Sequence, residues 1–149
     1  MKSLSLRLFS VGLGIIISAS VVAEEMFMMR TQQTFPETML NLQDEIKSHG
    51  YTLSRVQRVD IGLKKSGYKT DKYRIVFFAK IDEMKWLSES YPEWIPYLPL
   101  KVVIFSEGPD TLLIASDPDV IFVSDDPKLN KVVARWKKDI RSIFAKVGE

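Results

Sequence analysis

Apolar and polar positions follow two different periods along this chain, and these periods predict its secondary structure. In the stretch Met26–Thr31, Phe27, Met29 and Thr31 fall on one face, which is typical of a short strand. Four later stretches are also rich in β-branched and aromatic residues and predict strands. These are Tyr51–Ile61, with a bulge expected near Val56, Tyr73–Lys80, Leu100–Ser106 and Thr111–Ser116.

Two stretches have the helical period instead. Thr34-Phe35-Pro36-Glu37 has the form of a capping box, and the helix that it opens should end at Gly50. Asp126-Pro127 supplies an N-cap and a first-turn proline for a second helix. Its apolar residues keep helical spacing to the end of the chain: Leu129, Val132, Val133, Trp136, Ile140, Ile143, Phe144 and Val147.

The predicted order is therefore strand, helix, four strands, helix. A Gly- and Lys-containing connection, Ile61–Lys72, and a proline-rich crossing before Leu100 separate the middle strands. The turn Glu107-Gly108-Pro109-Asp110 predicts a hairpin between the last two strands. Because the strands are grouped between two helices, we expect a single α+β domain with an antiparallel sheet and helices packed on one face.

The first residues have the three parts of an export signal. Lys2 and Arg7 are followed by an apolar run from Leu8 to Ala23, and Val21 and Ala23 fit the cleavage-site pattern. This run of 16 residues is shorter than the roughly 20 that span a bilayer as a helix, although an uncleaved anchor is the alternative. We expect cleavage after Ala23, a periplasmic domain of residues 24–149, and no stable membrane insertion afterwards.

Composition excludes several classes of function. The chain has no cysteine and one histidine, so a cysteine nucleophile, a disulfide framework and a cysteine zinc site are absent. Lys2 and Arg7 account for the formal net charge of +2. The expected mature domain is then neutral, which argues against a nucleic-acid partner.

Several short motifs, read in order, resemble the domain-of-unknown-function 302 family. They are Thr34 before Phe35-Pro36-Glu37-Thr38, then Gly50-Tyr51, Val59-Asp60, Leu98-Pro99 before Val102–Glu107, and Ser116-Asp117-Pro118. The resemblance spans residues 26–122 and implies an α+β fold like that of the TATA-binding protein, without implying DNA binding. Many members have Cys-Asn-Pro where this chain has Ala79-Lys80-Ile81-Asp82, so thiol chemistry is not transferred. The family implies no established activity.

The segment Trp86–Pro99 holds four large aromatic residues and three prolines, and it is the first candidate contact site. Its rings are either one wall of a ligand pocket or a lid that completes the core. Under the pocket interpretation, a small ligand or a protein partner contacts Trp86, Tyr91, Trp94 and Tyr97, and no cofactor is required.

Two carboxylates complete the list of candidate contacts. Asp60 and Asp117 would line the same site, or would serve as the general base of a hydrolase-like enzyme, which is the alternative function. His49 next to Gly50 is expected to satisfy the helix end rather than to act in catalysis. The spacing of Asp117, Asp119, Asp125 and Asp126 does not match a calcium loop, so we expect no metal site.

Charge is unevenly distributed along the chain. Ten of the 19 acidic residues lie between Asp82 and Asp126, where only Lys85 and Lys101 are basic, whereas the last helix is rich in lysine and arginine. Such segregation is either a set of solvated turns and helix faces or a basis for association between copies. A structural homodimer that uses a sheet edge or the basic helix is therefore a third possible function.

Overall fold

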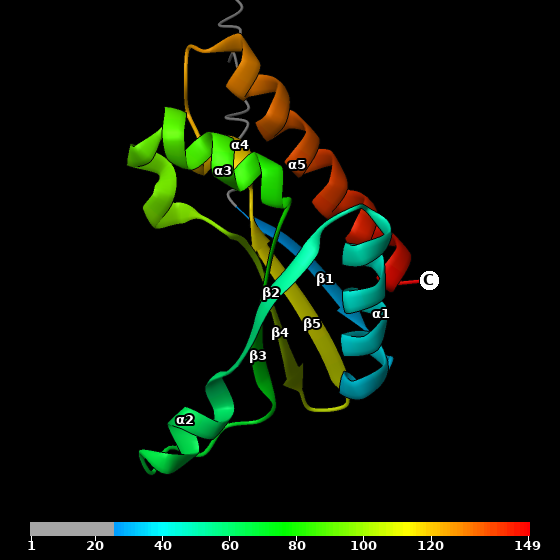
Figure 1. The fold of residues 1–149 in the computed structure, drawn as a ribbon. Helices are drawn as coiled ribbons and strands as arrows, with labels where there is room; N and C mark the ends of the chain where they lie inside the picture. The colour runs from blue at the N-terminus through cyan, green and yellow to red at the C-terminus, as the bar shows by residue number, and fades with distance from the viewer. Residues whose placement is uncertain (1–25) are drawn as a thin grey trace, which may run out of the picture.

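The computed structural model describes residues 26–149, and the predicted α+β class is confirmed (Figure 1). The elements in chain order are β1 (Met26–Thr31), α1 (Phe35–Ser48), β2 (Thr52–Arg58), α2 (Val59–Lys65), β3 (Tyr73–Ala79), α3 (Ile81–Ser90), the 3-10 helix η1 (Pro92–Tyr97), β4 (Leu100–Glu107), β5 (Asp110–Ser116), α4 (Pro118–Ile121) and α5 (Pro127–Val147). The expected signal segment, residues 1–23, lies outside the described residues. Among those described, no helix is both long and apolar enough to cross a membrane.

The five strands form one antiparallel sheet in the order β1-β5-β4-β3-β2. The hairpin between β4 and β5 is where the turn residues predicted it, and Gly108 there has φ 58°, a left-handed conformation that glycine adopts without strain. β1 and β2 are the two edges of the sheet.

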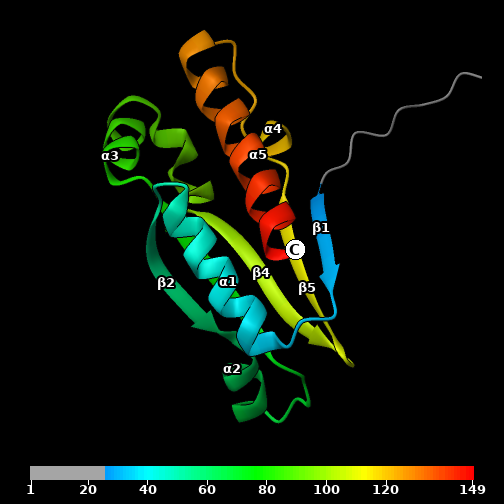
Figure 2. The ribbon, with the colours of Figure 1, turned by 90° about the vertical axis from the view of Figure 1, so that its right-hand side faces the viewer.

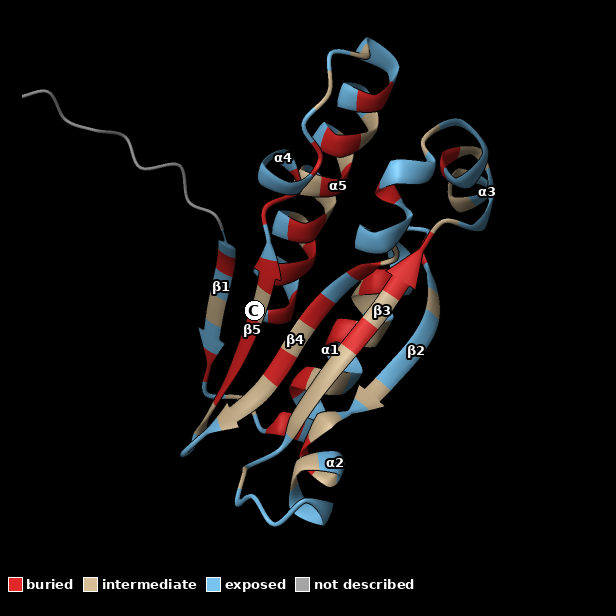
Figure 3. Ribbon diagram, turned by 90° about the vertical axis from the view of Figure 1, so that its left-hand side faces the viewer, coloured by how far each residue is buried: buried red, intermediate tan, exposed pale blue. Residues whose placement is uncertain are grey.

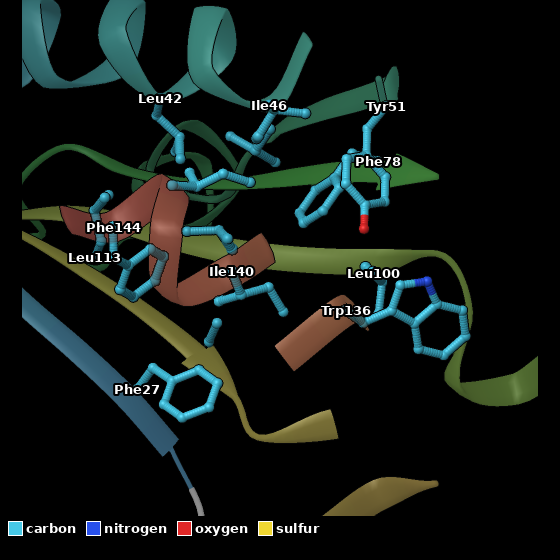
Figure 4. Close-up of a cluster of buried hydrophobic side chains, with 14 of the residues drawn as sticks. Phe27, Leu42, Ile46, Tyr51, Phe78, Leu100, Leu113, Trp136, Ile140 and Phe144 are labelled. Atoms are coloured by element: carbon cyan, nitrogen blue, oxygen red, sulfur yellow. The ribbon is translucent and has the colours of Figure 1, made fainter. Parts of the chain in front are cut away.

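Helices α1 and α5 lie side by side on one face of the sheet (Figure 2). The apolar stripe of α5 packs against α1 and the strands, and Trp136, Ile140 and Phe144 point into this layer (Figure 4). Leu42 and Ile46 on α1 and Phe78 and Leu113 on the strands complete its centre, and all four are fully buried. The core therefore lies on one side of the sheet only.

Residues at the two ends of α1 form the contacts that set where the helix begins and ends, as predicted. The hydroxyl of Thr34 donates to the Glu37 carboxylate over 2.6 Å, and the Thr34 amide donates to the same carboxylate over 3.0 Å. At the other end, His49 Nδ1 lies 2.8 Å from the Glu45 carbonyl oxygen and Nε2 lies 3.1 Å from Ser142 Oγ on α5. His49 thus joins the end of α1 to α5, a structural role of the kind that the sequence indicated.

The structure corrects two local expectations. The strand predicted to reach Ile61 ends at Arg58, because Val59 begins α2, whose Asp60 pairs with Arg74 on β3. The proline-rich crossing before β4 contains two helices that were not predicted: α3 precedes the prolines, and η1 contains two of them. In both cases, β-branched or proline residues hid a short element that tertiary contacts stabilise. The expected bulge in β2 is present, because the register shifts between Leu53 and Arg55, next to Val56.

Candidate functional site

Within residues 26–149, no helix covers the face of the sheet opposite α1 and α5 (Figure 3). Because side chains alternate along a strand, every second residue of β1, β3, β4 and β5 points to this side. We call this surface the open face and define it by its apolar residues: Met28, Tyr73, Ile75, Phe77, Val103, Phe105, Leu112 and Ile114. None of them belongs to the core cluster on the helical side.

The strand register arranges the open face in rows that run across the sheet. Ile75, Val103, Ile114 and Met28 are aligned on four neighbouring strands and form a wholly apolar row. Tyr73, Phe105 and Leu112 form the next row, which ends at Arg30 on β1. Leu112 is buried and the other apolar residues of the two rows are partly or fully exposed, so the rows form one contiguous apolar surface.

A trough of about 580 Å³ lies at one end of the open face. Tyr73, Val103, Phe105 and Ile114 supply its apolar floor, and the loop before β3 and the β4–β5 hairpin supply a polar rim. Its volume is within the range of about 300–1,000 Å³ that small-molecule sites occupy. The trough can therefore take an apolar group and offer hydrogen bonds at its edge.

The two ends of the open face carry opposite charge. Arg55 and Lys101 flank Phe77 on the neighbouring strands, so one end is basic. At the other end Glu107 and Asp110 are aligned on β4 and β5, and Asp71 joins Glu107 on the rim of the trough. Arg30 forms salt bridges with both Glu107 and Asp110, and its side chain crosses β5 next to Leu112, which is only 3% exposed.

Most of the segment Trp86–Pro99, which we call the aromatic-proline segment, packs against other parts of the fold. Trp94 is 8% exposed and packs 4.9 Å from the ring of Phe122, which in turn contacts Trp136 in the core. Tyr91 donates its hydroxyl to Asp126, the N-cap of α5, and packs between Trp86 and Trp94.

The outer two rings of the segment remain accessible. Trp86 lies under the ammonium of Lys128, 4.4 Å from the ring centre, beside a cleft of about 610 Å³. Tyr97 is 57% exposed and borders a hollow of only about 30 Å³, which is the volume of one water molecule. The structure thus brings Trp86, Tyr91 and Trp94 together, but mainly as a lid over the end of the core.

The two candidate carboxylates lie apart from these rings and from each other. Asp60 is 4% exposed at the start of α2 and forms a salt bridge with Arg74, at the opposite end of the molecule from α3 (Figure 1). Asp117, also 4% exposed, caps α4 by accepting from the Asp119 amide over 2.9 Å and pairs with Lys137 over 2.8 Å. Neither carboxylate lines the trough. Within residues 26–149, no group of three or more His, Cys, Asp or Glu is placed to hold a metal ion.

Sequence reasoning did not find the open face. The runs Tyr73–Ala79 and Leu100–Phe105 are apolar at nearly every position, which is typical of strands buried on both faces. The missed signal was the small number of long amphipathic helices: residues 26–149 hold two, α1 and α5, and both pack on the same side of the sheet. Continuous apolar strands with too few helices to cover them indicate an exposed apolar face.

Comparison with known proteins agrees with this architecture. The family model described as "Domain of unknown function DUF302" matches residues 27–147. Among solved structures, the crystal structure of an uncharacterized conserved DUF302 protein from Bacillus stearothermophilus superposes with a TM-score of 0.74 at 18% identity, covering 84% of this chain and 99% of that one. A search of curated proteins found no match.

The packing of Trp94 gives a first prediction. Trp94→Ala should lower the free energy of unfolding by about 3–5 kcal/mol, because it removes a large buried ring next to Phe122. Tyr97→Ala in the same segment removes an exposed ring and should cost less than about 1 kcal/mol. Urea unfolding followed by circular dichroism measures both values. Similar small losses in the two variants would show that Trp94 is not part of the core.

The contact between Tyr91 and Asp126 gives a second prediction. The Tyr91 hydroxyl, and after it the Lys128 amide, hold the pKa of the Asp126 carboxyl below its ordinary value. A depressed pKa contributes stability above the ordinary value, and this contribution is lost as the pH falls through the folded-state value. Tyr91→Phe should therefore raise the pKa of Asp126, and its stability difference from the wild type should shrink below about pH 4. NMR titration of the Asp126 carboxyl carbon tests this, and equal midpoints in both proteins would refute it.

Proposed function

This chain belongs to the DUF302 family, and from that membership and the geometry of its sheet we propose that it is a non-enzymatic binding protein whose contact surface is the open face. The occupant is a small apolar ligand or a protein partner. The observation that carries the proposal is the wholly apolar row of Ile75, Val103, Ile114 and Met28, on a side of the sheet that no helix of residues 26–149 covers. Removal of apolar area from water is favourable by about 25 cal/mol per Å², and a complex keeps the part of this that exceeds the free energy lost in ordering the two partners.

The position of the candidate acids supports binding over hydrolysis. A general base must reach a substrate proton, whereas Asp60 and Asp117 are buried carboxylates, each paired with a cation and each away from the trough. The aromatic-proline segment supports the proposal less than the open face does, because Tyr91 and Trp94 already contact other residues of the fold. Trp86 and Tyr97 keep accessible rings and remain secondary contact candidates.

We propose that this binding takes place after export to the periplasm. The basic residues Lys2 and Arg7, the apolar run that follows and the small residue Ala23 support removal of residues 1–23 as a signal peptide. The domain that binds is then residues 24–149, and its mass identifies the cleavage site.

A two-residue change on the open face tests the proposal. Val103→Thr combined with Ile114→Thr keeps the β-branched side chains that strands favour but adds hydroxyl groups to the apolar row, so it should abolish occupancy while the strands still form. Native mass spectrometry of protein recovered from cells detects either kind of occupant as mass above that of the chain beginning at Glu24. We expect added mass in the wild type and its loss in the double variant.

The control is Val56→Thr, the same substitution at a half-exposed site that faces the helical side of β2, where it pairs with Val76. The added mass should persist in this variant. Added mass that survives Val103→Thr/Ile114→Thr, or a wild type that carries none, would contradict the proposal.

A further inference from the structure

The charges of the open face are complementary to those of the same face on a second copy that is turned end over end. The apolar and aromatic rows lie between the basic end, Arg55 and Lys101, and the acidic end, Asp71 and Glu107. The amide of Ser106 donates to the Lys72 carbonyl over 2.9 Å, which keeps the start of β3 beside the end of β4 and so keeps Asp71 in the acidic end.

Each end also keeps charge that its own side chains do not neutralise. Arg30 pairs with Glu107 and Asp110, so it offsets one of the three carboxylates at the acidic end. Lys72 also lines the trough, but its ammonium lies 5.6 Å from the ring centre of Phe35 and is not counted there. Among residues 26–149, two negative charges remain at this end, against the two positive charges of Arg55 and Lys101. Neither Arg55 nor Lys101 has a carboxylate within salt-bridge distance among residues 26–149. Their charges are thus available to a partner.

From this layout we infer that the occupant of the open face is a second copy of this chain, bound in an antiparallel two-fold dimer. The inference rests on the proposed function, since it names the partner for that surface. A two-fold interface is self-complementary, so each surface group must meet a compatible group on the other copy. The open face satisfies this condition when one copy is turned end over end.

The geometry of β4 fixes the position of the axis. Lys101 and Glu107 point to the same side and are six residues apart, which is about 20 Å along a strand. Their midpoint lies between Val103 and Phe105, inside the apolar rows. An axis there, parallel to the rows, places Lys101 of each copy against Glu107 of the other and stacks the two apolar bands. Stacked sheets pack in this aligned manner at about 10 Å.

The extent of the open face suits such a contact. Five strands at a spacing of about 4.8 Å and a length of about 20 Å give a projected area of roughly 500 Å². Side chains make the accessible area larger than this projection, which brings it toward the roughly 800 Å² per partner of a standard interface. A small ligand in the trough would cover only one end and would leave the Ile75 and Phe77 side of the face in water.

Charge reversal tests the dimer. A basic-end variant, Arg55→Glu/Lys101→Glu, and an acidic-end variant, Asp71→Lys/Glu107→Lys, each place like charges in contact across the axis. Each alone should raise the dimer dissociation constant by more than about tenfold. An equimolar mixture should restore association, because each reversed end then meets the opposite charge. Sedimentation velocity on protein produced from its complete sequence measures the dissociation constants.

The control is Lys131→Glu/Lys138→Glu on the exposed side of α5. It makes the same change of charge as Arg55→Glu/Lys101→Glu and should leave the dimer intact. Circular dichroism confirms that each variant is folded. A monomeric wild type, or reversed variants that dimerise as tightly as the wild type, would overturn the inference, as would a mixture that does not recover association. Native mass spectrometry could instead show a monomer that carries a small molecule, with that added mass lost in Val103→Thr/Ile114→Thr. This result would overturn the dimer and would leave the proposed function standing.

Discussion

The packing of the α5 stripe against one face of the sheet is the contact on which the rest of this structure depends. Trp136, Ile140 and Phe144 anchor that helix across the strands, and α1 fills the remaining width of the same layer. Both long amphipathic helices of residues 26–149 are then used. The shorter elements lie at the ends of the sheet, where η1 and α3 close the core and α2 extends one corner (Figures 1 and 2). No long helix of the described residues is left for the opposite face.

The proposed function follows from an apolar sheet face that no helix of residues 26–149 covers. Strands β3 and β4 provide that face because their residues are apolar on both sides, which a strand exposed to water on one side does not require. The charged residues at the two ends of the face add orientation to the apolar contact. Apolar burial supplies most of the affinity of such a surface, whereas the placement of charge selects the partner and the register. A second copy fits both properties at once.

The sequence was sufficient for the framework because the relevant signals are local. The capping box at Thr34, the left-handed Gly108 turn and the Asp126 cap each depend on residues within a few positions, and each is present in the structure. Helix α2 depends instead on a distant partner, Arg74, and could not be read from its own residues.

The site was harder to predict because it has no motif. Composition alone made the aromatic-proline segment a candidate site. The burial of Trp94 depends on its contact with Phe122, which lies well beyond the segment in the chain. The open face arises from strand order: Ile75, Val103 and Ile114 become one row only when β3, β4 and β5 are neighbours. A single sequence does not fix that order.

Thiol cross-linking in this cysteine-free chain tests the two-fold contact most directly. Two single-cysteine proteins, Lys101→Cys and Glu107→Cys, are treated separately and as a mixture with a bis-maleimide whose reach matches the sheet separation of about 10 Å, which is too wide for a direct disulfide. The antiparallel dimer places each position opposite the other, so the mixture should form cross-linked dimers. Each protein alone should remain largely uncross-linked, because its own two cysteines are about 20 Å apart along the strand direction. Equal self-cross-linking of the separate proteins, or no cross-linking in the mixture, would contradict the arrangement.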